Sequence, residues 1–112
     1  MRKHISDWQE VVYHNNVKHG FHEVGVFDIH QKLLLVVGEI TEAQEELRAG
    51  HSPTEIYYSL EGTKPEGFGV ELADAVIRIL DIAEAEGINL EMLIDMKHEY
   101  NVTRPYKHGR KF

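Results

Sequence analysis

The sequence has no cysteine and only three prolines among its 112 residues. The lack of cysteine excludes disulfides, thiolate catalysis and cysteine-based metal sites, and fits a reducing compartment. The longest unbroken aliphatic run, residues 33–37, is five residues long, whereas a membrane-spanning helix needs roughly 20. The N-terminus also lacks the apolar core of a signal peptide. We therefore expect a single cytoplasmic domain over residues 1–112 with no membrane partner.

Negative charge exceeds positive charge, and the two signs are unevenly distributed. The chain has 19 acidic residues against 12 lysines and arginines, a net charge of −7. Residues 1–96 hold 18 of the acidic groups and 7 of the basic ones, while residues 97–112 hold 5 basic groups and 1 acidic group. Affinity for duplex nucleic acid comes largely from cations that neutralise phosphates, so this acidic body predicts no duplex partner. The basic C-terminal segment could still bind one small polyphosphate.

The spacing of apolar residues predicts helices almost throughout the chain. We expect four helices, over residues 6–19, 29–49, 68–86 and 90–102, followed by a basic tail over residues 103–112. Glycines follow the first three helices, and Pro105 limits the fourth, as is typical of helix ends. Four helices joined mostly by short links predict an all-α fold that resembles a four-helix bundle.

Two local patterns predict finer detail. Ser6 followed by Gln9 resembles a capping box, which would start the first helix at Ser6. The connection over residues 50–67 contains Ser52, Pro53 and Glu55 at the spacing of a helix start, so it could hold a short helix.

Acidic residues interrupt two strongly apolar helices at helical spacing. The helix over residues 68–86 is apolar around almost its whole circumference, which predicts a buried helix. Its charged residues lie on one stripe, spaced three, four and three apart: Glu71, Asp74, Arg78 and Asp81. In the helix over residues 29–49, Glu39 and Glu42 follow five consecutive aliphatic residues and are again three apart. Each helix therefore offers one pair of carboxylates on one face.

A carboxylate that loses its hydration must be paired with a cation, protonated or bound to a metal. Only Arg78 lies on the same stripes as Glu39, Glu42, Glu71 and Asp74. Ligands that are all oxygen favour a hard cation, Mg²⁺ or its substitute Mn²⁺, which also binds substrate phosphates. The alternative is a solvated, acidic helix face with no ligand, because Glu-x-x-Glu is common on helix surfaces. Pattern alone does not decide between the two.

These residues resemble the signature of the MazG-like, all-α nucleoside triphosphate pyrophosphohydrolases. That signature is Glu-x-x-Glu, a spacer, and Glu-x-x-Asp; here Glu39 and Glu42 are separated from Glu71 and Asp74 by 28 residues. The tail, from Lys97 to Gly109, is similar to the family's ending with a lysine, an asparagine and an arginine. The resemblance extends over nearly the whole chain. One departure is Gly38, which stands where many members carry an additional glutamate.

The resemblance implies hydrolysis of a nucleoside or deoxynucleoside triphosphate between the α and β phosphates, with Mg²⁺ held by the four acidic residues, which would also be the catalytic ones. It further implies a homodimer or homotetramer in which the basic tail completes a neighbour's site. The residues expected to bind substrate are, for phosphate or sugar, Lys97, Asn101, Arg104, Lys107 and Lys111, and, as a base platform, Trp8. The alternative is a catalytically weak, nucleotide-binding regulator, because Gly38 leaves the general base unidentified.

Overall fold

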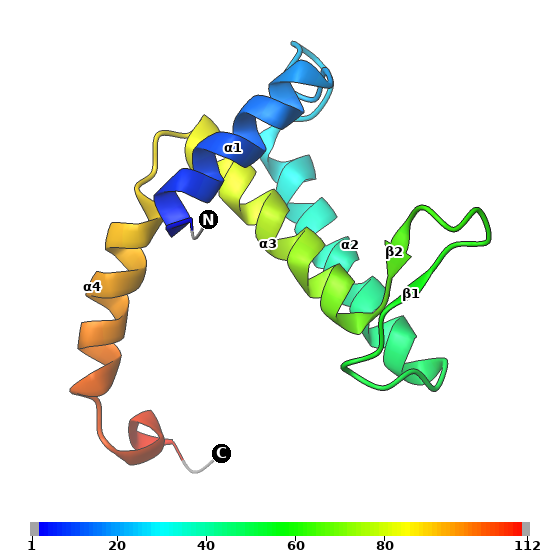
Figure 1. Cartoon of the computed structure of the whole chain (residues 1–112). Coiled ribbons are helices and arrows are strands. Elements are labelled where there is room, and N and C mark those ends of the chain that lie inside the picture. Colours follow the sequence, from blue (N-terminus) through cyan, green and yellow to red (C-terminus); the bar gives the residue numbers. More distant parts are fainter. Residues whose placement is uncertain (1–2, 111–112) are drawn as a thin grey trace.

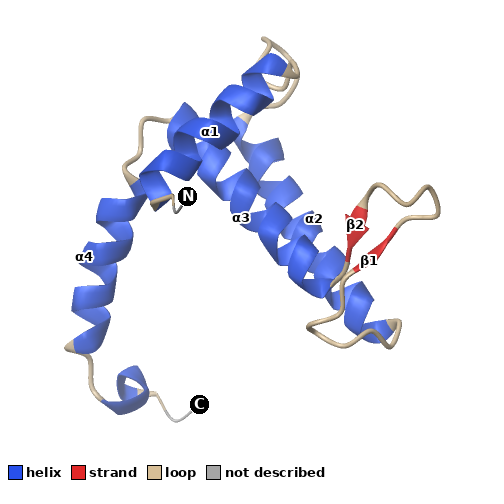
Figure 2. Cartoon of the chain, in the orientation of Figure 1, coloured by secondary structure: helices blue, strands red, loops and turns tan. Residues whose placement is uncertain are grey.

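The structure, a computed structural model, describes residues 3–110, and these residues are mostly helical (Figure 2). The elements along the chain are α1 (Ile5–Lys18), α2 (Ile29–Arg48), β1 (Tyr57–Tyr58), β2 (Pro65–Glu66), α3 (Phe68–Ala85), α4 (Leu90–Val102) and the 3₁₀ helix η1 (Tyr106–Gly109). Within this part of the chain, no helix combines the length and the apolar character needed to cross a bilayer. The expectation of a mostly helical chain is confirmed, and each end of the four predicted helices lies within one residue of the observed end.

The start of α1 differs from its prediction. Ser6 lies inside the helix, which begins one residue earlier, and the carboxylate of Asp7 accepts a hydrogen bond of 2.9 Å from the backbone N–H of His4. Gln9 is buried instead of capping the helix. Its side chain donates to the carbonyl oxygen of Ile88 at 3.0 Å and accepts from the backbone N–H of Leu90 at 3.1 Å. Gln9 therefore joins α1 to the turn between α3 and α4.

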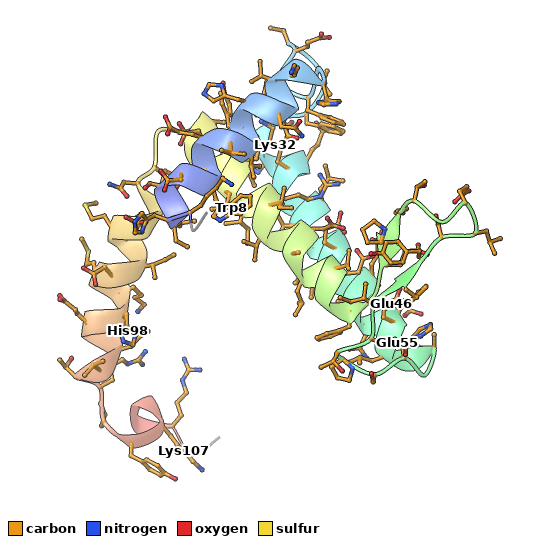
Figure 3. All side chains as sticks on the ribbon, in the orientation of Figure 1. Trp8, Lys32, Glu46, Glu55, His98 and Lys107 are labelled. Carbon is orange, nitrogen blue, oxygen red and sulfur yellow. The ribbon has the colours of Figure 1, made fainter. Side chains whose placement is uncertain are left out.

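The connection after α2 forms a small hairpin, and the predicted short helix is wrong. Strand β1 pairs with β2 in antiparallel register, Tyr57 opposite Glu66. The hydroxyl of Tyr57 donates to the carboxylate of Glu46 at 2.8 Å, and its ring stacks on His51 at 4.5 Å. These contacts raise the pKa of Tyr57 to about 12, chiefly through the hydrogen bond to Glu46. The hairpin is thus fastened to the C-terminal end of α2, where Figure 3 shows Glu46 and Glu55.

Helices α1, α2 and α3 pack together, whereas α4 projects from them (Figure 1). Helices α2 and α3 run antiparallel and lie side by side, and α1 packs against the C-terminal half of α3, where Gln9 also meets Glu84. Helix α4 leaves the bundle next to the start of α1 and points away from α2. Three helices therefore form the packed unit, and the fourth does not close it into a four-helix bundle within one chain.

A single chain leaves an unusually large apolar surface uncovered. Its accessible area is 8883 Å², about 2,600 Å² more than the roughly 6,300 Å² expected of a compact monomer of this mass. Its radius of gyration of 16.7 Å likewise exceeds the value of about 13 Å for a compact chain of this length. Helix α3, expected to be buried on all sides, exposes Leu72, Val76 and Ile79. That expectation is wrong for an isolated chain.

Candidate functional site

The acidic residues of α2 and α3 converge where the two helices pack. Glu39 and Glu42 are one turn apart on α2, and Glu71 lies opposite them on α3. One carboxylate oxygen from each of these three residues lies within 4.8 Å of the others. Three-residue spacing places the two glutamates of α2 on one face, and the packing of α3 then brings the third. The sequence prediction that the two stripes face each other is thereby realised in the geometry.

Arg78 compensates part of this negative charge. Its Nε donates a hydrogen bond of 2.9 Å to Oε1 of Glu39, from the turn of α3 that follows Asp74. Burial would raise the pKa of Glu39, but the hydrogen bond and positive charge of Arg78, with hydrogen bonding to Glu71 and Glu42, lower it. Glu39 therefore stays ionised in the cluster.

Glu71 has the most perturbed carboxyl group of the cluster. Its pKa is raised to about 8, first by burial, then by proton sharing with Glu39 and Glu42 and by the charges of Glu42 and Asp74. Its Oε2 is buried and accepts no hydrogen bond from any residue in the described range. A buried acceptor without a donor is costly, so this oxygen needs either a proton or a cation.

Asp74 lies at the edge of the cluster, outside the group of three. Burial raises its pKa, and the negative charge of Glu39 adds to that effect, while Arg78 opposes it. Asp74 and Glu39 together line one end of a pocket with a volume of about 340 Å³. The four predicted acidic residues are thus neighbours, and both Glu39 and Asp74 line this pocket.

The pocket beside the cluster is formed largely by residues that sequence reasoning did not select. Phe21 and Phe27 come from the loop between α1 and α2, and they line it together with Asn16 and Lys32. Trp8, the predicted base platform, is not among its lining residues. Trp8 lies near the start of α1, with the ammonium of Lys3 4.6 Å from its ring centroid (Figure 3). From the sequence, Phe21 and Phe27 are among the aromatic residues that could stack on a base, but a loop aromatic has no helical period to distinguish it from a core residue, and Trp8 was preferred to both.

The predicted phosphate-binding residues lie on the α4 arm, apart from the acidic cluster. Lys97 and Arg104 both approach the ring of Tyr100, at 4.7 Å and 5.6 Å from its centroid. Asn101 has a buried Oδ1 for which the described residues offer no donor. Lys107 follows in η1 at the far end of the arm (Figure 3), and Lys111 lies outside the described residues. Within the described residues, the predicted phosphate-binding cations of one chain therefore lie apart from its acidic cluster.

Comparison with protein-family models, with curated proteins and with solved structures finds no match to this chain. The chemistry of the site consequently follows from its own residues.

The donor set fits a hard divalent cation. It consists of carboxylate oxygens from two antiparallel helices, with one oxygen, Glu71 Oε2, buried and without a donor. Mg²⁺ prefers such oxygen ligands and is usually bound by a few carboxylates together with substrate phosphates. The opening into a neighbouring pocket, past Glu39 and Asp74, leaves room for an organic substrate next to the cation site.

Proposed function

We propose that this protein hydrolyses a nucleoside or deoxynucleoside triphosphate to the monophosphate and pyrophosphate in a reaction that requires Mg²⁺. The observation that carries the proposal is the convergence of Glu39, Glu42 and Glu71 at the side of a pocket that Asp74 also lines. The proposal gains support from the sequence resemblance to MazG-like pyrophosphohydrolases, whose acidic signature coincides with these four residues.

All four acidic residues would contribute to binding the cation. Glu39, Glu42 and Glu71 form the carboxylate group, and Asp74 extends it toward the pocket. Bound Mg²⁺ supplies positive charge at the phosphate oxygens and favours ionisation of water; Mn²⁺, which accepts the same ligands, is expected to substitute. Arg78 keeps Glu39 ionised, and a cation at the cluster would take the place of the proton that the raised pKa of Glu71 favours.

The alternative function is nucleotide binding with little catalysis. Gly38, directly before Glu39, carries no carboxylate, and a side chain there would meet open space, with no atom within 4 Å of an added Cβ. The proton acceptor for the attacking water must then be one of the four clustered acids, or catalysis is weak. Pyrophosphate release separates an enzyme from a regulator of this kind.

We also propose that the working form is a homo-oligomer, a dimer or a tetramer, in which α4 of one copy approaches the site of another. The support is quantitative: about 2,600 Å² of excess surface per chain matches what one partner buries in a large obligate interface. Helix α4 has no buried residue of its own, and it exposes Met92, Leu93 and Ile94. In such an assembly, Lys97, Arg104 and Lys107 would add positive charge to that of Arg78 at the acidic cluster.

The test is pyrophosphate release from a panel of nucleoside and deoxynucleoside triphosphates, with Mg²⁺, with Mn²⁺ and with a chelator. We expect metal-dependent release, and a fall of about 100-fold or more in Glu71→Gln and Asp74→Asn, because each removes a charge that acts on the reacting phosphates. The matched control is Glu45→Gln, which changes an exposed glutamate of α2 whose one ion pair within residues 3–110 is with Arg48. Intact substrates in the presence of tight nucleotide binding would favour the regulator, and loss of activity in the control would contradict the assignment of the site.

A further inference from the structure

The pocket beside the acidic cluster is lined by polar side chains as well as by aromatic ones. Phe21, Phe27 and Ile77 contribute apolar surface, and Asn16, Lys32 and Asp81 contribute polar groups. The side chain of Asp81 is only 10% exposed. A pocket of about 340 Å³ lies near the lower limit of small-ligand sites, so its size suits a base and a sugar. Its acidic end then receives the phosphates.

A directed chain of hydrogen bonds fixes the state of Asp81. The ammonium of Lys32 lies 3.4 Å from Nδ1 of His22, and Nε2 of His22 lies 2.6 Å from Oδ1 of Asp81. An ammonium can only donate, so Nδ1 of His22 accepts and Nε2 carries the proton that it donates to Asp81. The ring of Tyr13 packs on His22 at 4.7 Å between centroids and holds its orientation.

In this arrangement one carboxylate oxygen of Asp81 accepts a hydrogen bond within the chain, and the other can accept one from a ligand. Oδ1 accepts from His22, whereas Oδ2 has no hydrogen-bond donor among residues 3–110. Because Lys32 holds the tautomer of His22, the chain of donors ends at Asp81, and Asp81 presents an acceptor to the pocket it lines. A ligand atom that meets this oxygen must carry a hydrogen.

We propose that this pocket binds the base of the nucleotide and that Asp81 selects bases with an exocyclic amino group, namely cytosine, adenine and guanine, over uracil and thymine. This inference rests on the proposed function, since it assigns the base to the pocket next to the phosphate site. An amino group donates to the free oxygen of Asp81, whereas a carbonyl oxygen at the same position directs its lone pairs against the carboxylate. Phe21 and Phe27 offer ring faces for stacking, which tolerates any base. Of the polar groups Asn16, Lys32 and Asp81 in this pocket, only the carboxylate of Asp81 is purely an acceptor, so we assign the preference for an amino group to Asp81.

The test compares ligands that differ in the amino or oxo group and, with it, in the adjacent ring nitrogen, which accepts in cytosine and adenine and carries a hydrogen in uracil and hypoxanthine. Non-hydrolysable α,β-methylene analogues of dCTP and dUTP, and of dATP and dITP, are titrated into the full chain with Mg²⁺. We expect the amino member of each pair to bind about 10- to 100-fold more tightly, the size of one hydrogen bond to a charged group. Asp81→Asn keeps an oxygen for His22 and turns an N–H donor toward the pocket, so it should abolish or reverse the preference.

A matched control and separate outcomes keep this inference distinct from the proposed function. Glu86→Gln changes an exposed carboxylate at the end of the same helix and should leave the preference unchanged. Selective binding that depends on Asp81, without pyrophosphate release from any triphosphate, would support the base pocket and overturn the proposed function. Pyrophosphate release with equal binding of the paired analogues, or with a preference that survives Asp81→Asn, would overturn the base pocket alone. If none of the four analogues binds, both the base pocket and the proposed function are overturned. If Asp81→Asn does not fold, an absent or reversed preference in the wild-type protein still overturns the base pocket.

Discussion

Two regions of the molecule, the pair formed by α2 and α3 and the arm formed by α4, differ in how their apolar faces are covered. The two helices of the pair cover each other, whereas the arm stays uncovered within the described chain. In the pair, Arg78 reaches Glu39 across the interface, and Glu71 lies against the carboxylates of α2. The arm buries none of its residues and leaves the buried oxygen of Asn101 without a donor among the described residues. The pair therefore assembles the acidic cluster within one chain, while the arm leaves its apolar side chains uncovered in a single chain.

The largest expected effect comes from placing a charge on the arm. Ile94 is 48% exposed in a single chain, so Ile94→Asp should change the stability of a true monomer by no more than about 0.5 kcal/mol. If a second copy covers α4, the same substitution buries an unpaired carboxylate, and the association should weaken at least about 100-fold. Molar mass by analytical ultracentrifugation over a range of concentrations measures the difference.

The matched control for the arm is Val24→Asp, in the loop between α1 and α2. Val24 is fully exposed, and the substitution makes the same change from an aliphatic side chain to a carboxylate. We expect the control to retain the wild-type molar mass. An unchanged mass in Ile94→Asp, or a monomeric wild-type protein, would contradict the proposed oligomer and leave the arm without a partner.

A smaller effect is expected at the start of α3, where the position of the helix pair depends on a close contact within the chain. Gly67 precedes α3 with a φ of +142°, and a Cβ there would lie less than 3.0 Å from the carbonyl oxygen of Glu55. Gly67→Ala should therefore lower the free energy of unfolding by about 2–4 kcal/mol, from backbone strain together with the collision. Urea denaturation followed by circular dichroism measures the loss.

Gly69→Ala provides the control two residues later. Gly69 is the second residue of α3, and an added Cβ there meets no atom within 4 Å. Because alanine is the better helix former, this variant should be as stable as the wild type or gain up to about 1 kcal/mol. Equal destabilisation by both substitutions would mean that the position of α3 does not depend on the approach of Gly67 to Glu55.

The difference between the two regions also explains what the sequence could predict. Helix ends and the same-face placement of the carboxylates on each helix follow from local signals: the cap at Asn89, the glycine stops and the three-residue spacing of Glu39 and Glu42. The direction of α4 depends on tertiary contacts, which no helical period encodes. A short helix was predicted in place of the hairpin because Ser52, Pro53 and Glu55 have the spacing of a helix start. The contact that holds the hairpin, between Tyr57 and Glu46, joins residues that are eleven positions apart in the chain.

The pocket was missed for a related reason. Asp81 was visible on the charged stripe of its helix, but its partner His22 is 59 residues away and belongs to a loop. The side chains that make Asp81 an acceptor therefore cannot be read from its own helix. Glu46 shows the same limit. Its place in the sequence predicts a solvated side chain, yet that side chain is 14% exposed and accepts a hydrogen bond from the hydroxyl of Tyr57.

The smallest expected effect concerns pH and the metal-free pair. Since the pKa of Glu71 rises from 4.5 to about 8 on folding, the folded chain binds more protons than the unfolded chain between these values. The free energy of unfolding must then fall as pH rises through this window, by on the order of 1–2 kcal/mol because water still reaches the half-buried carboxyl. The raised pKa of Asp74 acts in the same direction, while the lowered pKa of Glu39 contributes stability that is lost only when pH falls below its ordinary range.

Mg²⁺ should reverse this trend, because a cation replaces the proton that the cluster needs. We expect Mg²⁺ to raise the melting temperature more at pH 8.5 than at pH 6, and metal binding near pH 7 to release protons, measured by titration calorimetry in buffers of different ionisation enthalpy. Glu71→Gln should flatten the pH dependence of the metal-free protein. Stability that increases from pH 6 to pH 8.5 in chelator, or an equal gain from Mg²⁺ at both values, would show that the cluster is not proton-linked. The absence of any gain from Mg²⁺ at either value would show that it is not a cation site. The pair of helices would then differ from the arm only in packing.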